Sequence, residues 1–315
     1  MSRTIPVVDL SKFTKGNEAE RAEFVNKLGN AFQDTGFVGV INHGVPKQLV
    51  DAFYAAANAF FALPTEHKKK YEIEGLAGQR GYTSFGKEQA KGAKVPDLKE
   101  FFQIGQTVRD GDSIKSAYPD NVQVAEANFT QLGDELYQSF ERAGAALLEA
   151  IAIYLDLDSD YFKDKIHNGN SILRAIHYPP ITREPDSAVR AEQHEDINLI
   201  TLLVGASAGG LQLLNMQDEW LDITPGENEI VVNVGDMLQR LTNNYLKSTT
   251  HRVVNPPRDQ WHLPRLSIPF FLHPRTTMDL TSLGSCVTEE RPLAYEPITA
   301  GEYLNERLRE IGLKK

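Results

Sequence analysis

The chain has 315 residues, of which 41% are hydrophobic and 24% are charged, so it can bury a substantial core. Its formal net charge of -10, without an extended basic cluster, argues against a nucleic-acid partner. No segment approaches the ~18 uninterrupted apolar residues of a membrane helix, and the start lacks an apolar signal segment. The lone Cys286 excludes a disulfide within the chain. These features predict a cytoplasmic protein outside the membrane, with its oligomeric state left open.

The first half of the chain is expected to be mainly helical, because its apolar residues recur at intervals of three and four. Gly36 and Pro64 end two of these helices, and Pro46 begins one. The expected elements, in chain order, are a strand over 5–10, a helix over 17–35, a strand over 37–41, helices over 46–63 and 66–71, and a long helix over 125–155.

A glycine-rich segment over 75–106 interrupts this helical pattern. Such a segment predicts a long loop with short strands, and loops of this length are usually either functional or disordered, of which the first is favoured here. Aromatic residues give it a means of packing against the rest of the protein, and Tyr82 and Phe102 are candidate substrate contacts.

Short strands separated by Gly, Pro and Asn dominate from residue 171 onward, which predicts a sandwich or a barrel. A final helix is expected over 299–311, with Thr299 and Glu302 forming a capping box. No repeat or break in composition divides the chain, so a single domain is expected. The expected strands cover residues 172–178, 198–204, 211–215, 220–223, 230–234, 248–253 and 266–272.

Three residues in this second half form a candidate metal site. His194 and Asp196 share a face if they lie on one strand, since side chains two positions apart point the same way. His251, from a distant strand, would complete a set of two histidines and one carboxylate. This set is typical of non-haem Fe(II) oxygenases, although zinc is a competing metal for the same ligands.

Arg265 and Ser267 form a second candidate site by the same alternation. A guanidinium and a hydroxyl on one face can hold a carboxylate through charge-assisted hydrogen bonds. Such a contact suits the far carboxylate of 2-oxoglutarate, which favours iron over zinc. The alternation also carries this face onward to Phe271 and His273, the leading candidates for substrate contacts.

Motifs along nearly the whole chain, in the same order, resemble the isopenicillin N synthase-like family of 2-oxoglutarate- and Fe(II)-dependent dioxygenases. Besides the two candidate sites, they are Ile5–Leu10, Gly36–Pro46, Gly81-Tyr82, Asp97–Glu100, His-Tyr-Pro-Pro at 177–180, Gly209–Gln212, Val232–Asp236 and Lys247–Val253.

The resemblance implies an α+β, mainly β fold whose core is a double-stranded β-helix, or jelly roll, flanked by N-terminal and support helices. The chain would be one catalytic domain over 1–315. Its parts would be a mainly helical portion over 1–165 that includes the substrate-side loop 75–106, a jelly-roll core over 170–275, and a C-terminal extension with a helix over 276–315.

The resemblance also implies the chemistry. Fe(II) would be bound by the two histidines and the aspartate, and 2-oxoglutarate and O2 would be consumed during hydroxylation, desaturation or ring closure of a small molecule. Tyr178 would point inward, with its hydroxyl near the 2-oxoglutarate carboxylate, and His177 would face away. Ile176 stands where plant relatives often have Asn, which removes one polar contact to the co-substrate.

Three other functions remain open from the sequence. Some oxidases of the family keep the Arg-x-Ser pair for a substrate carboxylate and do not use 2-oxoglutarate. Another variant fragments 2-oxoglutarate to ethylene. A non-catalytic jelly-roll binding protein or sensor is the alternative from a different class, although its expected signature, a broken ligand set, is absent from this sequence. The sequence does not identify the substrate.

Overall fold

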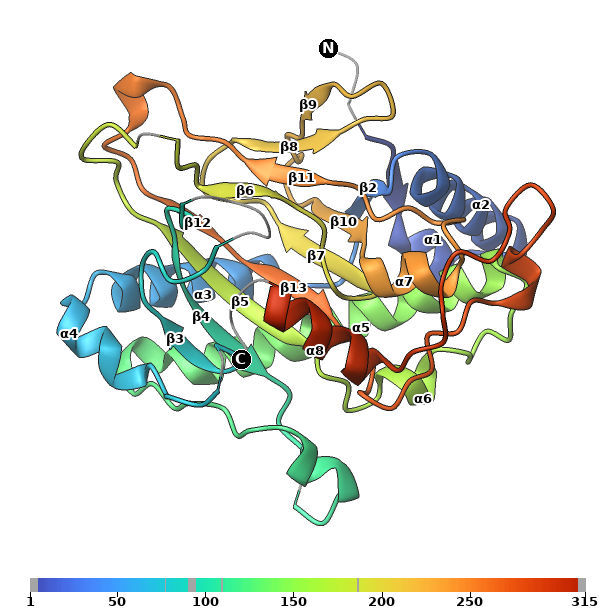
Figure 1. Cartoon of the computed structure of the whole chain (residues 1–315), viewed down its shortest axis with the longest axis horizontal. Coiled ribbons are helices and arrows are strands. Elements are labelled where there is room, and N and C mark those ends of the chain that lie inside the picture. The colour runs from blue at the N-terminus through green and yellow to red at the C-terminus, as the bar shows by residue number, and fades with distance from the viewer. Residues whose placement is uncertain (1–4, 77, 90–94, 109, 186, 311–315) are drawn as a thin grey trace.

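The computed structural model describes residues 5–76, 78–89, 95–108, 110–185 and 187–310. Two β-sheets form its centre, and the helices lie mainly along the large sheet (Figure 1). Among the described residues, the large sheet has nine strands: β1 (Val7–Asp9), β2 (Phe37–Ile41), β3 (Gly81–Thr83), β4 (Glu100–Gly105), β5 (Ile172–Tyr178), β7 (Ile200–Val204), β10 (Ile230–Val234), β12 (Arg265–Ser267) and β13 (Pro269–Leu272).

The strand order of the large sheet is β1-β2-β10-β7-β13-β5-β4-β3, with β12 also paired to β5. Every pairing in it is antiparallel except that of β1 with β2. The small sheet has the order β6-β11-β8-β9. Two mainly antiparallel sheets with crossover connections are consistent with the jelly roll that the family resemblance predicted. The strands of the small sheet are β6 (Ala191–His194), β8 (Leu211–Leu214), β9 (Trp220–Asp222) and β11 (His251–Val253).

The helices pack mainly against one face of the large sheet, and the longest of them, α5, contacts β4, β5, β7 and β13. Gly144 allows this close approach, because a Cβ there would lie 2.3 Å from Cδ1 of Leu272. The described α-helices are α1 (Leu10–Thr14), α2 (Glu18–Asp34), α3 (Lys47–Phe61), α4 (Thr65–Lys68), α5 (Phe129–Tyr154), α6 (Lys163–Ile166), α7 (Asp236–Leu241) and α8 (Ala300–Glu310).

Short 3-10 helices connect several of these elements, at Lys69–Tyr71, Ser113–Ala117, Glu126–Asn128, Arg258–Gln260 and Gly284–Cys286. The helix α2 begins with the capping box of Asn17 and Glu20, and Thr299 and Glu302 make the capping contacts predicted for α8. Long helices with a clear apolar stripe therefore form close to the predicted positions.

Several predicted strands are shorter than expected, and the strands differ most from the prediction in two places. The segment 266–272 was expected to be one strand, but it divides into β12 and β13 around Ile268. Pro269 contributes to this division, because it has no N–H to donate to a neighbouring strand. The strand β6 was not predicted, because its sequence, Ala-Glu-Gln-His, has none of the β-branched or aromatic residues that usually mark a strand.

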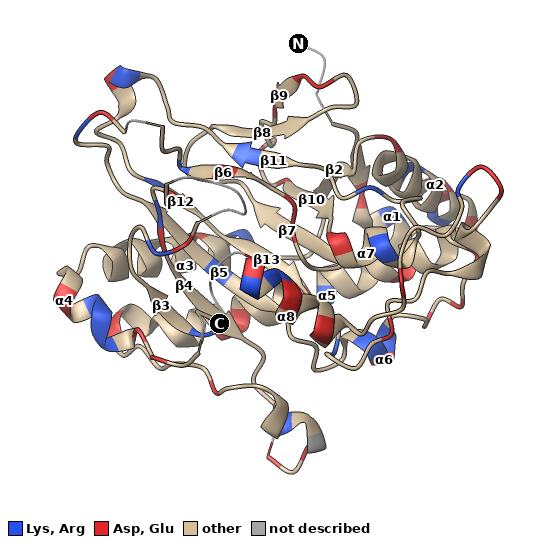
Figure 2. Cartoon of the chain, in the orientation of Figure 1, with Lys and Arg blue, Asp and Glu red and all other residues tan. Residues whose placement is uncertain are grey.

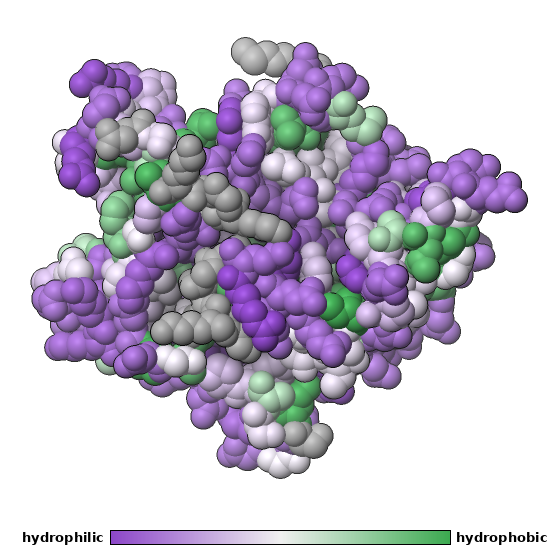
Figure 3. Space-filling view, viewed as in Figure 1, coloured by the Kyte–Doolittle hydropathy of each residue, from purple (hydrophilic) through white to green (hydrophobic). Residues whose placement is uncertain are grey.

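Charged residues of both signs are interspersed along surface elements such as α2 and α8 (Figure 2). The face shown in Figure 3 is mostly hydrophilic, and its hydrophobic residues form small, separate patches. Within the part of the chain that the structure describes, no helix combines the length and apolar character required to cross a bilayer.

Candidate active site

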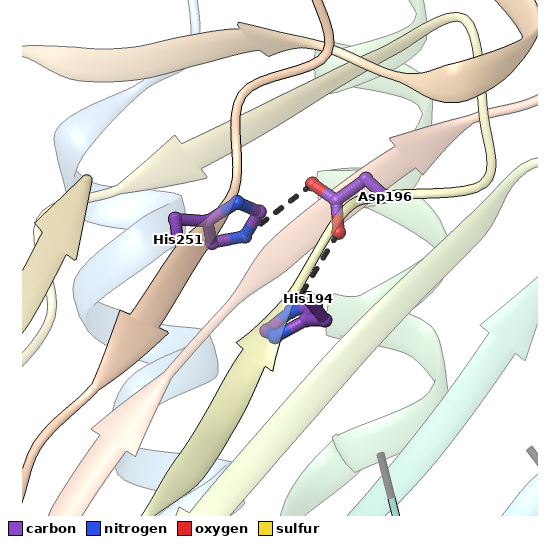
Figure 4. Close-up of side chains that lie close together, drawn as sticks. All are labelled: His194, Asp196 and His251. Carbon is purple, nitrogen blue, oxygen red and sulfur yellow. Dashed lines mark ion pairs between the residues drawn. The ribbon is translucent and has the colours of Figure 1, made fainter. Parts of the chain in front are cut away.

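The three predicted metal ligands converge at the edge of the small sheet (Figure 4). His194 ends β6, and His251 begins β11 directly opposite it in the antiparallel register. Asp196 lies two residues beyond the end of β6, so strand alternation alone does not place it. Its Oδ1 and Oδ2 lie 4.0 Å from Nε2 of His194 and 3.8 Å from Nε2 of His251. One ligand atom from each residue can therefore face a common centre, with all three within 4.8 Å of one another.

Neighbouring groups fix the orientation of both imidazoles. Nδ1 of His194 lies 2.6 Å from the carbonyl oxygen of Glu192, and Nδ1 of His251 lies 3.1 Å from that of Thr249. An Nδ1–H that donates to a carbonyl leaves the Nε2 lone pair directed into the site. Burial and the nearby His251 lower the pKa of His194 to about 4, so this imidazole is neutral near pH 7, as metal binding requires.

The large sheet holds the carboxylate. Oδ2 of Asp196 accepts hydrogen bonds from Thr201 on β7, at 2.6 Å, and from Asn233 on β10, at 2.8 Å. Burial alone would raise the pKa of Asp196, but the two histidines and these hydrogen bonds outweigh it, and the net shift is downward. The site thus presents two imidazoles and one anionic carboxylate, a donor set that fits Fe(II).

The predicted carboxylate site lies on β12 and β5. Arg265 stands opposite Tyr178 in the antiparallel register, and its guanidinium carbon lies 5.0 Å from the Tyr178 ring centroid. Nε of Arg265 donates to the carbonyl oxygen of Ala208, at 3.1 Å. Its Nη1, however, is buried with no hydrogen-bond partner among the described residues. A buried guanidinium with an unused donor fits a bound carboxylate, because such a donor is costly to leave unpaired.

A cavity of about 230 Å³ joins the two groups. Its wall includes Tyr178, Arg265 and every second residue after Arg265 as far as His273. Phe271 and His273 line this cavity, in agreement with the predicted alternation. The Nδ1 of His273 is buried without a hydrogen-bond partner in the described structure, and burial lowers the pKa of this imidazole to about 4. The cavity wall therefore contains a neutral imidazole with an unpaired nitrogen.

His177 faces the opposite side of the sheet, as predicted. Its Nδ1 lies 2.8 Å from Oε1 of Glu100, and its ring stacks on Phe61 of α3. Tyr82 and Phe102 also lie on this helical side, which differs from the prediction that they contact substrate. The Tyr82 hydroxyl donates to Glu100. These two residues therefore belong to the core.

Alternation along β4 explains the difference. The Phe102 ring centroid lies 5.3 Å from that of Phe60 and 5.0 Å from that of Phe129 on the helical side. The next residue, Gln103, consequently points the other way and lines the cavity. The segment 75–106 does reach the cavity, but through residues other than its two predicted aromatics.

A buried ionic network in the cavity wall was not predicted. Nζ of Lys99 lies 2.7 Å from Glu88 and 2.8 Å from Asp97, and Arg174 lies 3.3 Å from Glu88. Alternation along β5, counted back from Tyr178, would have identified Arg174 as an inward residue. Glu88 lies in a loop that packs against Arg174 of β5, and Asp97 accepts from the backbone N–H of Glu192. These contacts depend on tertiary structure, so strand alternation could not predict them.

The C-terminal helix α8 contributes the other unpredicted part of the wall, through Leu304, Arg307 and Leu308. The Tyr303 hydroxyl donates to Oδ2 of Asp236, at 3.1 Å, and Nη2 of Arg307 lies 3.7 Å from the same oxygen. These contacts hold α8 beside the metal site.

Comparisons with known proteins agree with this geometry. Residues 5–126 match a family described as the N-terminal domain of non-haem dioxygenases in morphine synthesis, and residues 169–274 match the 2OG-Fe(II) oxygenase superfamily. The 2-oxoglutarate-dependent dioxygenase ecdK of Aspergillus rugulosus is 32% identical, over 95% of this chain and 97% of that protein.

Two solved structures are also similar over most of their length. A 2OG-Fe(II) oxygenase family protein from Caulobacter crescentus is 44% identical, with a TM-score of 0.88 over 98% of this chain and 100% of that one. A Neurospora crassa protein, solved at full length in complex with alpha-KG and thymine, is 31% identical, with a TM-score of 0.85 over 97% of this chain and 96% of that one.

The chain therefore belongs to the 2-oxoglutarate- and Fe(II)-dependent oxygenase family of the isopenicillin N synthase-like type. It is a 2-oxoglutarate-dependent Fe(II) dioxygenase, and its cofactor and co-substrates are Fe(II), 2-oxoglutarate and O2. This assignment favours iron over zinc and an enzyme over a non-catalytic binding protein.

Proposed function

We propose that this dioxygenase couples the oxidative decarboxylation of 2-oxoglutarate to the hydroxylation of a small molecule, with Fe(II) bound by His194, Asp196 and His251. The observation that carries the proposal is the convergence of these three side chains in one cavity with the unpaired guanidinium of Arg265. Bound iron would supply the activation of O2 and the oxidation of a C–H bond.

Arg265, Ser267 and Tyr178 are proposed to hold 2-oxoglutarate through its far carboxylate. All three line the cavity, and Arg265 and Ser267 project from the same short strand. The guanidinium offers charge-assisted hydrogen bonds, and the hydroxyl of Ser267 offers a further donor. This anchor would leave the 2-oxo acid end of the molecule directed toward the metal ligands.

Phe271 and His273 are proposed to contact the substrate. They lie on the same inward face as Arg265, further along the chain. The Phe271 ring offers an apolar surface, and the unpaired Nδ1 of His273 offers one hydrogen bond. The cavity of about 230 Å³ is below the usual range of about 300–1,000 Å³ for ligand pockets, which favours a compact substrate.

Succinate release from 2-oxoglutarate tests the reaction class. Wild-type protein with Fe(II), O2 and 2-oxoglutarate should form succinate, and Asp196→Ala should reduce the rate by about 100-fold or more because one ligand is lost. Arg265→Gln should raise the KM for 2-oxoglutarate. The exposed Arg258, exchanged in the same way, is the matched control and should leave both values unchanged.

Product analysis separates the alternatives. Oxidation of a substrate without succinate would contradict the proposal and favour an oxidase, and ethylene in the headspace would identify fragmentation of 2-oxoglutarate itself. Thymine is a first probe, since the similar Neurospora crassa protein was solved with it. A substrate that is turned over should show a higher KM in Phe271→Ala and His273→Ala, and its oxidised product would distinguish hydroxylation from desaturation or ring closure.

A further inference from the structure

A second buried arginine lies beside the proposed 2-oxoglutarate anchor. The guanidinium carbon of Arg190 is 6.0 Å from the ring centroid of Tyr178, and that of Arg265 is 5.0 Å from the same centroid. Both arginines are 2% exposed. Arg190 immediately precedes β6, the strand that ends at His194, so it connects the metal site with the carboxylate site.

The positive charge of Arg190 is not balanced by the described part of the protein. No ion pair with a carboxylate is present at Arg190 or Arg265 among the described residues, and each guanidinium retains one buried nitrogen without a partner, Nε in Arg190 and Nη1 in Arg265. The Nη2 of Arg190 does donate to the carbonyl oxygen of Leu263, at 2.9 Å. Burial and the charge of Arg265 lower the pKa of Arg190 to about 10, which leaves it charged near pH 7.

Two buried, unpaired cations next to one another are destabilising, since each has lost hydration and each repels the other. Such an arrangement is retained where an anion is bound. The proposed ligand, 2-oxoglutarate, carries two carboxylates, and its far carboxylate would enter the cavity beside Arg265 and Tyr178.

We propose that Arg190 is a positioning residue of the 2-oxoglutarate site. It lies beside Tyr178 and adds its charge to that of Arg265 in attracting the far carboxylate. The inference rests on the proposed 2-oxoglutarate site. Arg190 does not line the cavity, so it acts through the electrostatic potential rather than by direct contact.

Binding of two 2-oxo acids to Arg190→Met tests this role. With Fe(II) and without O2, 2-oxoglutarate should bind about tenfold or more weakly than to wild type, because one of two nearby cations is lost. The affinity for 2-oxobutyrate should stay within about twofold, because this molecule has no far carboxylate for the charge to attract. Without ligand, the variant should unfold at an equal or higher urea concentration, since an uncompensated buried charge has been removed.

Two further variants separate charge from the contact with Leu263. Arg190→Gln keeps a side-chain N–H donor but not the charge, so it should behave like Arg190→Met toward 2-oxoglutarate. Arg190→Lys keeps the charge and should bind 2-oxoglutarate within about threefold of wild type. These variants also decide the question if Arg190→Met does not fold.

Arg80→Met is the matched control. Arg80 is 1% exposed, also has a buried Nε without a partner in the described chain, and lies near Gln106 rather than Tyr178. Its replacement should leave the affinity for both acids unchanged. The inference is overturned if Arg190→Met and Arg190→Gln bind 2-oxoglutarate as wild type does, or if they lose affinity for both acids equally. Binding of 2-oxoglutarate by the wild-type protein tests the proposed site. The change in the ratio of the affinities for 2-oxoglutarate and 2-oxobutyrate on replacement of Arg190 tests the role of Arg190.

Discussion

Asp196 is the most constrained of the three proposed metal ligands. Both hydrogen bonds to its Oδ2 come from the large sheet, through Thr201 and Asn233, whereas the two histidines belong to the small sheet. These contacts are needed because Asp196 lies beyond the end of β6, where no strand pairing fixes its backbone. Loss of a group that hydrogen-bonds to a metal ligand commonly lowers the affinity for the metal by about 10- to 100-fold.

Replacement of Asn233 should therefore weaken metal binding. We expect Asn233→Ala to bind Fe(II) roughly tenfold less tightly, because Asp196 loses the hydrogen bond that fixes its rotamer. Anaerobic titration with Fe(II) measures this change. Asn215→Ala, in the exposed β8–β9 turn, is the control and should bind the metal like wild type. Unchanged Fe(II) affinity in Asn233→Ala would contradict this role.

Residue spacing placed Arg265 and Ser267 on one face of β12, but it did not by itself place Asp196, which lies beyond β6 and is held by Thr201 and Asn233. The convergence of His251 with His194 required only that two strands pair. Arg190 left no comparable signal, because its importance arises from the absence of a carboxylate partner among the described residues of the folded protein. The positions of Tyr82 and Phe102 were predicted incorrectly because a strand in an irregular loop can present either face.

Among the elements of the structure, the helix α8 both lines the cavity and contacts Asp236 next to the site. Tyr303 and Arg307 attach the helix to Asp236, the first residue of α7. The backbone N–H of Asp236 in turn donates to the carbonyl oxygen of Asp196, at 2.7 Å. The helix that covers the cavity and the loop that carries a proposed metal ligand are therefore joined through one residue, Asp236, whose carboxylate contacts α8 and whose backbone N–H contacts the loop.

Loss of one of these contacts should loosen α8 without removing a proposed ligand. We expect Arg307→Gln to increase substrate-independent succinate formation several-fold, since a less firmly closed cavity admits water. The measurement is succinate formed from 2-oxoglutarate in the absence of a second substrate. Arg309→Gln, at an exposed position of the same helix, is the matched control. An equal rate in the two variants would contradict this role for α8.

The sequence predicted long elements better than short ones. The helix α5 was evident from its apolar stripe, and its buried residues agree with that pattern. The sequence did not predict how closely α5 approaches the large sheet, because this distance depends on the contact of Gly144 with Leu272 of β13. Short polar strands such as β6 form through pairing with a neighbour, so their own composition does not predict them.

At the scale of the whole molecule, stability should depend on pH through buried carboxyl groups away from the cavity. Burial raises the pKa of Glu141 in α5 above its usual value of 4.5. The unfolded chain loses this proton at lower pH than the folded protein, so the free energy of unfolding falls as pH rises above 4.5. The fall ends once pH exceeds the pKa in the folded state.

Replacement of Glu141 by glutamine should remove its contribution to the pH dependence of stability. We expect Glu141→Gln to be more stable relative to wild type at pH 8 than at pH 4, because glutamine does not ionise. Urea unfolding at the two pH values measures the difference, and succinate formation should be unchanged. Glu18→Gln, at an exposed position of α2, is the control. A relative stability that is independent of pH would contradict the assignment.

The distribution of the proposed ligands between two sheets has a mechanical consequence. His194 and His251 extend from the small sheet, whereas Asp196 is held by strands of the large one. An ion bound by all three would therefore cross-link the small sheet to the large sheet. Metal loading would then prepare the cavity for its organic ligands by restricting how far the two sheets can separate, in addition to supplying reactivity.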